Sequence, residues 1–155
     1  MMSKKLGIIA ILIAVVLVGF FVSGRNNSSN REEKSQVKEA QTKQAPVFKD
    51  ISAKEAADLV EKNKDNPNFA IIDVRAASEY ASGHLENAIN LDYSSPSFKS
   101  ELERLDKDKT YLVYCRSGAR SQKAIEVMKE LEFGEVYNLL GGITSWVAQG
   151  LPTVR

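Results

Sequence analysis

One segment of the sequence combines a nucleophile with the means to bind an anion. Cys115 is the only cysteine, the apolar run Tyr111–Tyr114 leads into it, and the loop CRSGAR continues to Arg120 before a helical pattern begins. Gly118 permits the backbone dihedral angles of a tight loop, and the N–H groups of such a loop can converge on one anion. A free cysteine has a pKa near ~8.5, which a helix N-terminus and nearby arginines (here Arg116 and Arg120) can lower. We therefore expect a thiolate that attacks either a sulfane sulfur donor or a phosphoester.

The composition excludes disulfide bonds within the chain and metal sites built from several cysteines. With one cysteine and one histidine, His84, the chain can form neither an internal disulfide nor a multi-cysteine metal site, and we expect no metal and no cofactor. A lone cysteine is often only a small buried hydrophobe. The flanking Arg-Ser-Gly-Ala-Arg has no use in a core, so we favour a reactive thiol. His84 could act as a general base, but we favour a structural role in a turn.

Alternating patterns predict one α/β domain from about Val47. Helices are expected where apolar residues recur on one face, and strands where short apolar runs occur. The Ser52/Glu55 pair predicts a capping box, and Ser95 and Pro96 predict the start of another helix. In the last helix we expect Ile143, Trp146 and Val147 to point inward and Gly150 to end it. The expected helices cover 50–62, 95–105, about 120–131 and 141–150, and the expected strands 69–75, 87–92, 110–115 and 135–140.

In a mostly parallel sheet, ligands bind beyond the carboxyl ends of the strands. Three polar segments are expected at that edge: Asp73-Val74-Arg75, the loop from Cys115 to Arg120, and the turn Gly141-Gly142. The pattern therefore places the thiol at the functional edge of the sheet.

The first 46 residues differ from the rest. Lys4 and Lys5 precede the uncharged apolar run Leu6–Val22, whose length favours an uncleaved signal anchor over a cleaved signal peptide. We interpret 1–24 as that segment, with cleavage near Gly24 as the alternative, and 25–46 as a disordered polar linker. The two lysines favour a cytoplasmic amino end, so residues 47–155 are expected outside the cytoplasm, on a single-pass membrane anchor or secreted.

Charge argues against a nucleic-acid partner. The first 46 residues hold 7 Lys+Arg and 3 Asp+Glu, which leaves 14 basic and 17 acidic residues in 47–155. A domain with a net negative charge lacks the basic surface that nucleic-acid binding needs.

Three motifs in order resemble the rhodanese-like sulfurtransferase family across about Phe48–Pro152. They are IIDVRAASEYASGHLENAINLD, VYCRSGARS and NLLGGITSWVAQGLP. The resemblance implies an α/β domain with a central parallel sheet flanked by helices. It also implies that Cys115 becomes a persulfide and that the loop forms a cradle around it, with Asp73 and Arg75 as supporting groups. Asp73 is expected to pair with Arg75 or with Arg120. The cradle residues are Arg116, Ser117, Gly118, Ala119 and Arg120.

In the proteins that this sequence resembles, the length of the loop distinguishes sulfur transfer from phosphoester hydrolysis. Sulfurtransferases of the family have six residues counted from the cysteine, whereas related phosphatases have one more and a histidine before the cysteine. Here the loop from Cys115 to Arg120 has six, and Tyr114 precedes it, which favours sulfur over phosphate. The sulfur would come from thiosulfate or a persulfide and pass to cyanide, a small thiol or a protein cysteine. The alternative is a non-catalytic binding or redox-sensing module at the membrane.

Overall fold

The structure, a computed structural model, describes residues 45–155. The predicted signal segment and nearly all of the predicted linker lie outside the described residues. Within 45–155, no helix has the length and apolar character needed to cross a membrane.

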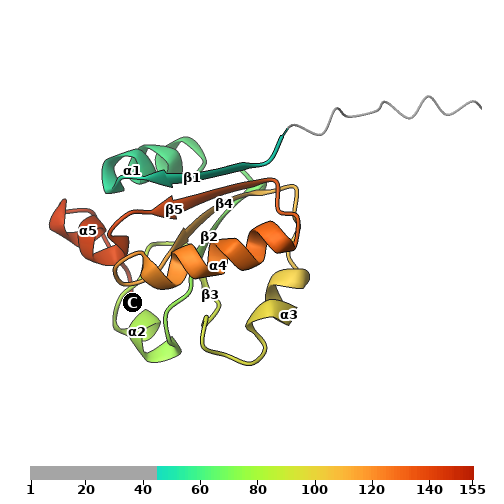
Figure 1. Cartoon of the computed structure of the whole chain (residues 1–155). Coiled ribbons are helices and arrows are strands. Elements are labelled where there is room, and N and C mark those ends of the chain that lie inside the picture. Colours follow the sequence, from blue (N-terminus) through green and yellow to red (C-terminus); the bar gives the residue numbers. More distant parts are fainter. Residues whose placement is uncertain (1–44) are drawn as a thin grey trace, which may run out of the picture. The chain divides into compact units, whose positions relative to one another are not determined.

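A five-stranded, fully parallel sheet forms the centre of the domain (Figure 1). Its spatial order is β1-β5-β4-β2-β3, so the edges are β1 and β3. The central position of β4 explains its continuous apolar sequence, because both of its faces are covered. The strands are β1 (Val47–Ile51), β2 (Phe69–Asp73), β3 (Ala88–Asn90), β4 (Thr110–Tyr114) and β5 (Glu135–Leu139).

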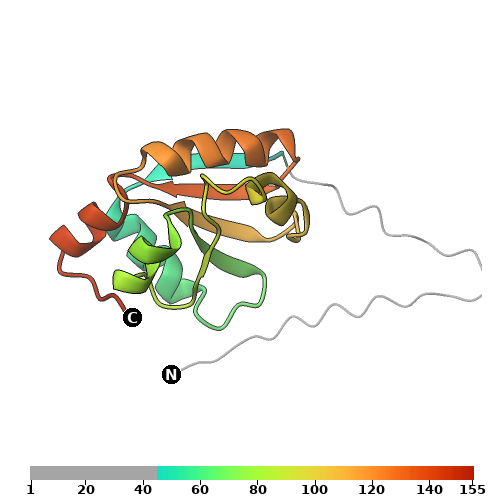
Figure 2. The same ribbon diagram turned by 90° about the horizontal axis from the view of Figure 1, so that it is seen from below.

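Helices cover both faces of the sheet, and Figure 2 shows α4 and α1 on opposite sides. One apolar cluster packs residues of α3 and α4 on one face, and a second packs residues of α1 and α5 on the other. Successive residues of β4 alternate between them: Val113 belongs to the first cluster and Tyr114 to the second. The helices are α1 (Ala53–Lys62), α2 (Ala77–Ser82), α3 (Phe98–Glu103), α4 (Ala119–Glu130) and α5 (Gly142–Ala148).

The sequence predictions for the elements are largely confirmed. The α/β class, the parallel sheet and the Ser52/Glu55 capping box are present. Gly150, with φ 72°, follows the last helix as expected. Four of the five strands and four of the five helices correspond to predicted segments.

Four details of the prediction are wrong. Residues Val47–Ile51 form an edge strand, although 50–51 were assigned to a helix, and α2 was not predicted. The third helix begins only at Phe98, because Pro96 lies in the preceding turn. Val147 is 56% exposed, whereas its neighbour Trp146 is buried in the core.

Candidate active site

Strand β4 delivers Cys115 to the carboxyl edge of the sheet. Cys115 follows Tyr114, the last residue of β4, and its side chain turns to the same face as Val113. It is only 1% exposed and packs in the cluster formed with α3 and α4. The thiol is therefore buried at the point where the loop begins.

The loop and the start of α4 direct hydrogen-bond donors at the thiol. The N–H of Gly118 donates to Cys115 Sγ at 3.1 Å, and Gly118 adopts a φ of 97°, which favours glycine. Burial by itself raises the pKa of the Cys115 thiol. The N–H groups of Ser121, Ser117 and Gly118 and the hydroxyl of Ser121 outweigh burial, so the pKa lies below its ordinary value. The expected direction is confirmed, but hydrogen bonds rather than arginine charges are the leading favourable cause.

The N-terminus of α5 holds the loop in this orientation. The N–H of Ile143 donates to the Cys115 carbonyl at 2.9 Å, and the N–H and hydroxyl of Thr144 donate to the Arg116 carbonyl at 3.1 and 2.9 Å. In a trans peptide the N–H points opposite to the carbonyl. Since the two carbonyls face α5, the N–H groups of Arg116 and Ser117 are turned away from α5.

Gly142 makes this close contact with α5 possible. A Cβ at Gly142 would overlap the carbonyl oxygen of Cys115 and lie 2.6 Å from the carbonyl carbon of Arg116. The Gly141-Gly142 pair was predicted only as a turn at the functional edge. The structure shows that Gly142 also supports the thiol loop directly.

The two arginines of the loop have different surroundings. Arg120 forms a two-pronged ion pair with Glu79 of α2, at 2.7 and 2.8 Å. This hydrogen-bonded pairing lowers the pKa of Glu79 to about 2. Arg116 is exposed, and within residues 45–155 it has no ion-pair partner. Glu79 was not predicted, because it belongs to the unpredicted helix α2 and approaches Arg120 only in the fold.

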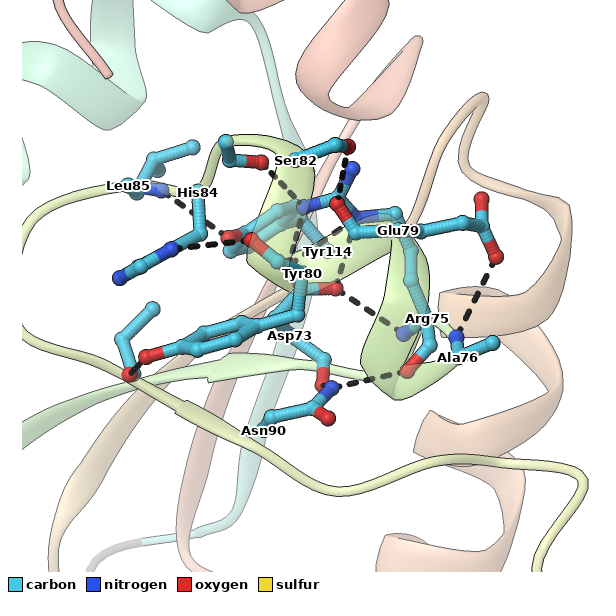
Figure 3. Close-up of polar contacts among 12 residues, drawn as sticks. Asp73, Arg75, Ala76, Glu79, Tyr80, Ser82, His84, Leu85, Asn90 and Tyr114 are labelled. Atoms are coloured by element: carbon cyan, nitrogen blue, oxygen red, sulfur yellow. Dashed lines mark hydrogen bonds and ion pairs between the residues drawn. The ribbon is translucent and has the colours of Figure 1, made fainter. Parts of the chain in front are cut away.

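Asp73 and Arg75 form a second ion pair, which Figure 3 shows beside α2. Their side chains meet at 2.6 Å, Asp73 is fully buried, and Arg75 also donates to the Gly83 carbonyl at 2.7 Å. Burial opposes the charge of Arg75, but the hydrogen bonds from its guanidinium to Asp73 raise its pKa. The predicted Asp73–Arg75 pair is confirmed, and the alternative pairing of Asp73 with Arg120 is wrong because Glu79 occupies Arg120.

His84 has a structural place near this pair. Its ring stacks on Tyr80 with centroids 3.7 Å apart, and its Nδ1 lies 3.1 Å from the Tyr80 carbonyl oxygen. Its backbone exchanges two hydrogen bonds with Val154. These contacts support the interpretation of His84 as a turn residue.

Two buried polar side chains beside the thiol were missed by the sequence analysis. The hydroxyl of Ser121 lies 3.7 Å from Cys115 Sγ and 2.7 Å from Oδ1 of Asn138 in β5. Both were assigned to regular elements with no further role. Their proximity depends on the pairing of β5 with β4, which local sequence does not reveal.

A cavity of about 460 Å³ opens between α2, the loop and α5. Both charged and apolar side chains line it, as is usual for pockets that bind small molecules. Cys115, which is 1% exposed, is not among the residues that line the cavity. The lining residues are Arg75, Glu79, Ser82, Arg116, Ile143, Thr144 and Val147.

Comparison with known proteins agrees with this fold and loop. The family description of the rhodanese-like domain matches residues 52–149. The chain therefore belongs to the rhodanese-like domain family, as the sequence motifs indicated.

Individual relatives cover most of the domain. The thiosulfate sulfurtransferase GlpE of Coxiella burnetii (strain RSA 331 / Henzerling II) is 38% identical over 102 residues, which span 66% of this chain and 90% of that protein. A sulfurtransferase of Allochromatium vinosum is 33% identical over 96 residues, spanning 62% and 88%. Among solved structures, a rhodanese-related protein of Thermoplasma volcanium is 31% identical with a TM-score of 0.57, over 68% of this chain and 97% of that one.

Proposed function

We propose that the protein is a rhodanese-type sulfurtransferase in which Cys115 carries the sulfur. The enzyme class is supported by the family and by relatives named sulfurtransferases. The observation that carries the residue assignment is the Gly118 N–H directed at Cys115 Sγ at 3.1 Å, in a loop that lowers the pKa of the thiol. A thiolate is the nucleophilic form of cysteine.

The reaction has two steps, each an attack at sulfur. The Cys115 thiolate attacks the outer sulfur of thiosulfate, the S–S bond of the donor breaks, and sulfite leaves with the electron pair. The product is a persulfide anion, and the loop N–H groups can donate hydrogen bonds to its terminal sulfur. An acceptor thiolate or cyanide then attacks the terminal sulfur and releases the Cys115 thiolate, so no net proton transfer by His84 is required.

The acceptor is a separate molecule in this proposal. The chain contains one cysteine, so no second thiol of the chain can resolve the persulfide. Arg116 lines the cavity beside the loop and has no ion-pair partner within residues 45–155. Its charge suits an anionic donor or a small anionic thiol, and Val147 and Ile143 add apolar contact.

Donor and acceptor profiling tests this function. Purified protein is assayed with thiosulfate or a small persulfide as donor, and with cyanide or a small thiol as acceptor. We expect turnover with at least one pair, and none with Cys115→Ser. If the variant retained the turnover of the wild type, the role of Cys115 would be refuted.

We further propose that the domain lies outside the cytoplasm on an N-terminal anchor. The support is the uncharged run Leu6–Val22 behind Lys4 and Lys5. Fractionation of an epitope-tagged full chain should place it in the membrane, with the tag on the carboxyl end accessible from outside. A full-length chain found only in the soluble cytoplasmic fraction would contradict this proposal.

A further inference from the structure

A chain of polar side chains runs from the outer strand β1 to the active-site sulfur. Asn138 Nδ2 donates to Oδ1 of Asp50 at 2.8 Å, and Asn138 Oδ1 lies 2.7 Å from the Ser121 hydroxyl. Ser121 Oγ in turn lies 3.7 Å from Cys115 Sγ. Asp50 and Asn138 are direct neighbours in the β1–β5 register. The chain therefore begins on β1, crosses to β5 and reaches the thiol through Ser121 of α4.

The amide orientation of Asn138 follows from its two partners. A carboxylate only accepts hydrogen bonds, so the NH₂ group of Asn138 faces Asp50 and its oxygen faces Ser121. Ser121 and Asn138 are 0% and 2% exposed, so water does not compete for these contacts. Asp50 is exposed and belongs to an edge strand.

The Ser121 hydroxyl has one hydrogen and three acceptors within reach. These are Asn138 Oδ1 at 2.7 Å, the Gly118 carbonyl at 3.0 Å and Cys115 Sγ at 3.7 Å. The shortest contact joins two oxygens, and because Asn138 Oδ1 carries no hydrogen, Ser121 must donate there. The sulfur therefore shares this hydrogen with two nearer acceptors, and the bond that Ser121 gives the thiolate is weaker than an undivided one.

We propose that Asp50, acting through Asn138, draws the Ser121 hydroxyl hydrogen partly away from Cys115 and thereby restrains the reactivity of the thiol. Asp50 and Asn138 are positioning residues in this proposal. Without Asp50, the Asn138 amide can turn over and donate to Ser121 Oγ, which leaves only the Gly118 carbonyl to compete with the sulfur for the hydroxyl hydrogen. A chain of hydrogen bonds thus links a surface carboxylate to the nucleophile.

Most of the other charged side chains around the loop are held in ion pairs of their own. Arg120 of α4 interacts with Cys115 but is paired with Glu79 of α2. Asp73 and Arg75, at the end of β2, are paired with each other. The α5 residues that contact the Cys115 and Arg116 carbonyls, Ile143 and Thr144, carry no charge. Asp50 is the charged group of β1 that hydrogen bonds connect to Ser121 and the thiol, and Arg116 is the remaining charge of the loop itself.

The test measures thiolate formation rather than sulfur transfer, so it remains readable even if Cys115 accepts no sulfur. Thiolate absorbance and the rate of alkylation by iodoacetamide are followed against pH in reduced protein, with Cys115→Ser as the blank. For Asp50→Ala we expect the thiolate to form with a midpoint at lower pH, because the sulfur gains a stronger hydrogen bond. Below that midpoint, the alkylation rate should rise roughly twofold to fivefold. The rise is smaller than the gain in thiolate, because a thiolate of lower pKa is also a weaker nucleophile.

Two further variants separate the hydrogen-bond chain from simple charge removal. Asp50→Asn removes the charge but retains an oxygen that can accept from Asn138 beside an NH₂ group that can donate to it, so it should shift the profile less than Asp50→Ala. In a Ser121→Ala background, Asp50→Ala should no longer move the midpoint, because the hydroxyl is absent. The proposal is overturned if Asp50→Ala leaves the profile unchanged, if Asp50→Asn shifts it equally, or if the shift persists without the Ser121 hydroxyl.

Discussion

The N–H of Ile143 donates to the carbonyl of Cys115 at 2.9 Å and so joins the last helix to the nucleophile loop. Next to it, Thr144 donates to the carbonyl of Arg116, a residue 28 positions earlier in the sequence. The active site therefore depends on α5 as well as on the loop that contains the cysteine. Because these contacts orient the loop peptides, changes in α5 should affect the chemistry without touching the sulfur.

Gly142→Ala should strongly reduce activity. The new Cβ overlaps the Cys115 carbonyl at a φ of 57°, so α5 must move away from the loop. We expect a loss of roughly tenfold to a hundredfold in kcat/KM, the size seen when a donor to a reacting charge is misplaced. Gly150→Ala is the matched control: its φ of 72° is also strained, but nothing lies within 4 Å of its Cβ. Equal activity in the two variants would contradict the proposed role of Gly142.

Substitutions of Arg116 and Arg120 should affect different properties, the first substrate binding and the second stability. Arg116→Gln removes an exposed charge at the cavity, so we expect a KM for thiosulfate raised several-fold with little change in Tm. Arg120→Gln breaks the ion pair with Glu79, so its main effect should be a lower Tm. Steady-state kinetics and thermal unfolding of both variants check this. The reverse pattern would mean that Arg120 is the group that binds the donor.

The Glu79–Arg120 pair should make stability depend on pH. The pKa of Glu79 is about 2 in the folded protein, against an ordinary value of 4.5 that applies to the unfolded chain. The stability that the ion pair contributes is therefore fully present above about pH 4.5 and is lost as the pH falls toward about 2. The Tm difference between wild type and Glu79→Gln should therefore be largest near neutral pH and shrink through that range. A difference that is constant from pH 7 to pH 3 would contradict the ion pair.

Asp73→Asn should destabilise the fold. Asp73 is fully buried, so the variant leaves the Arg75 guanidinium buried without its counter-charge. Breaking a buried pair in this way costs about 3–5 kcal/mol. The exposed Lys64–Glu61 pair is a matched control, and Glu61→Gln should change stability by less than about 1 kcal/mol. Urea unfolding of the two variants measures the contrast.

The sequence predicted the parts of the site that are local in the chain. The apolar run before Cys115, Gly118 in the loop and the helical stripe after it all express local preferences, and the order of the motifs pointed to the family. The Asp73–Arg75 pair was within reach because its members are two residues apart.

The parts that were missed depend on pairing between distant segments. Glu79 meets Arg120 across 41 residues, and Asn138 meets Asp50 across 88. Strand β1 was missed because it is an edge strand with a mostly exposed, mixed sequence, which lacks the apolar run of a central strand. Val147 was misassigned because a short helix at the sheet edge buries only part of its apolar stripe.

The central claim is that sulfur resides on Cys115 during turnover. Intact-mass spectrometry of the reduced protein after incubation with thiosulfate, without an acceptor, measures this directly. The account predicts a mass gain of one sulfur atom, and peptide mapping should place that atom on Cys115. The Cys115→Ser variant should show no gain, and in the wild type the gain should disappear when a thiol or cyanide is added. A protein that gains no sulfur from thiosulfate or any other sulfane donor would contradict it.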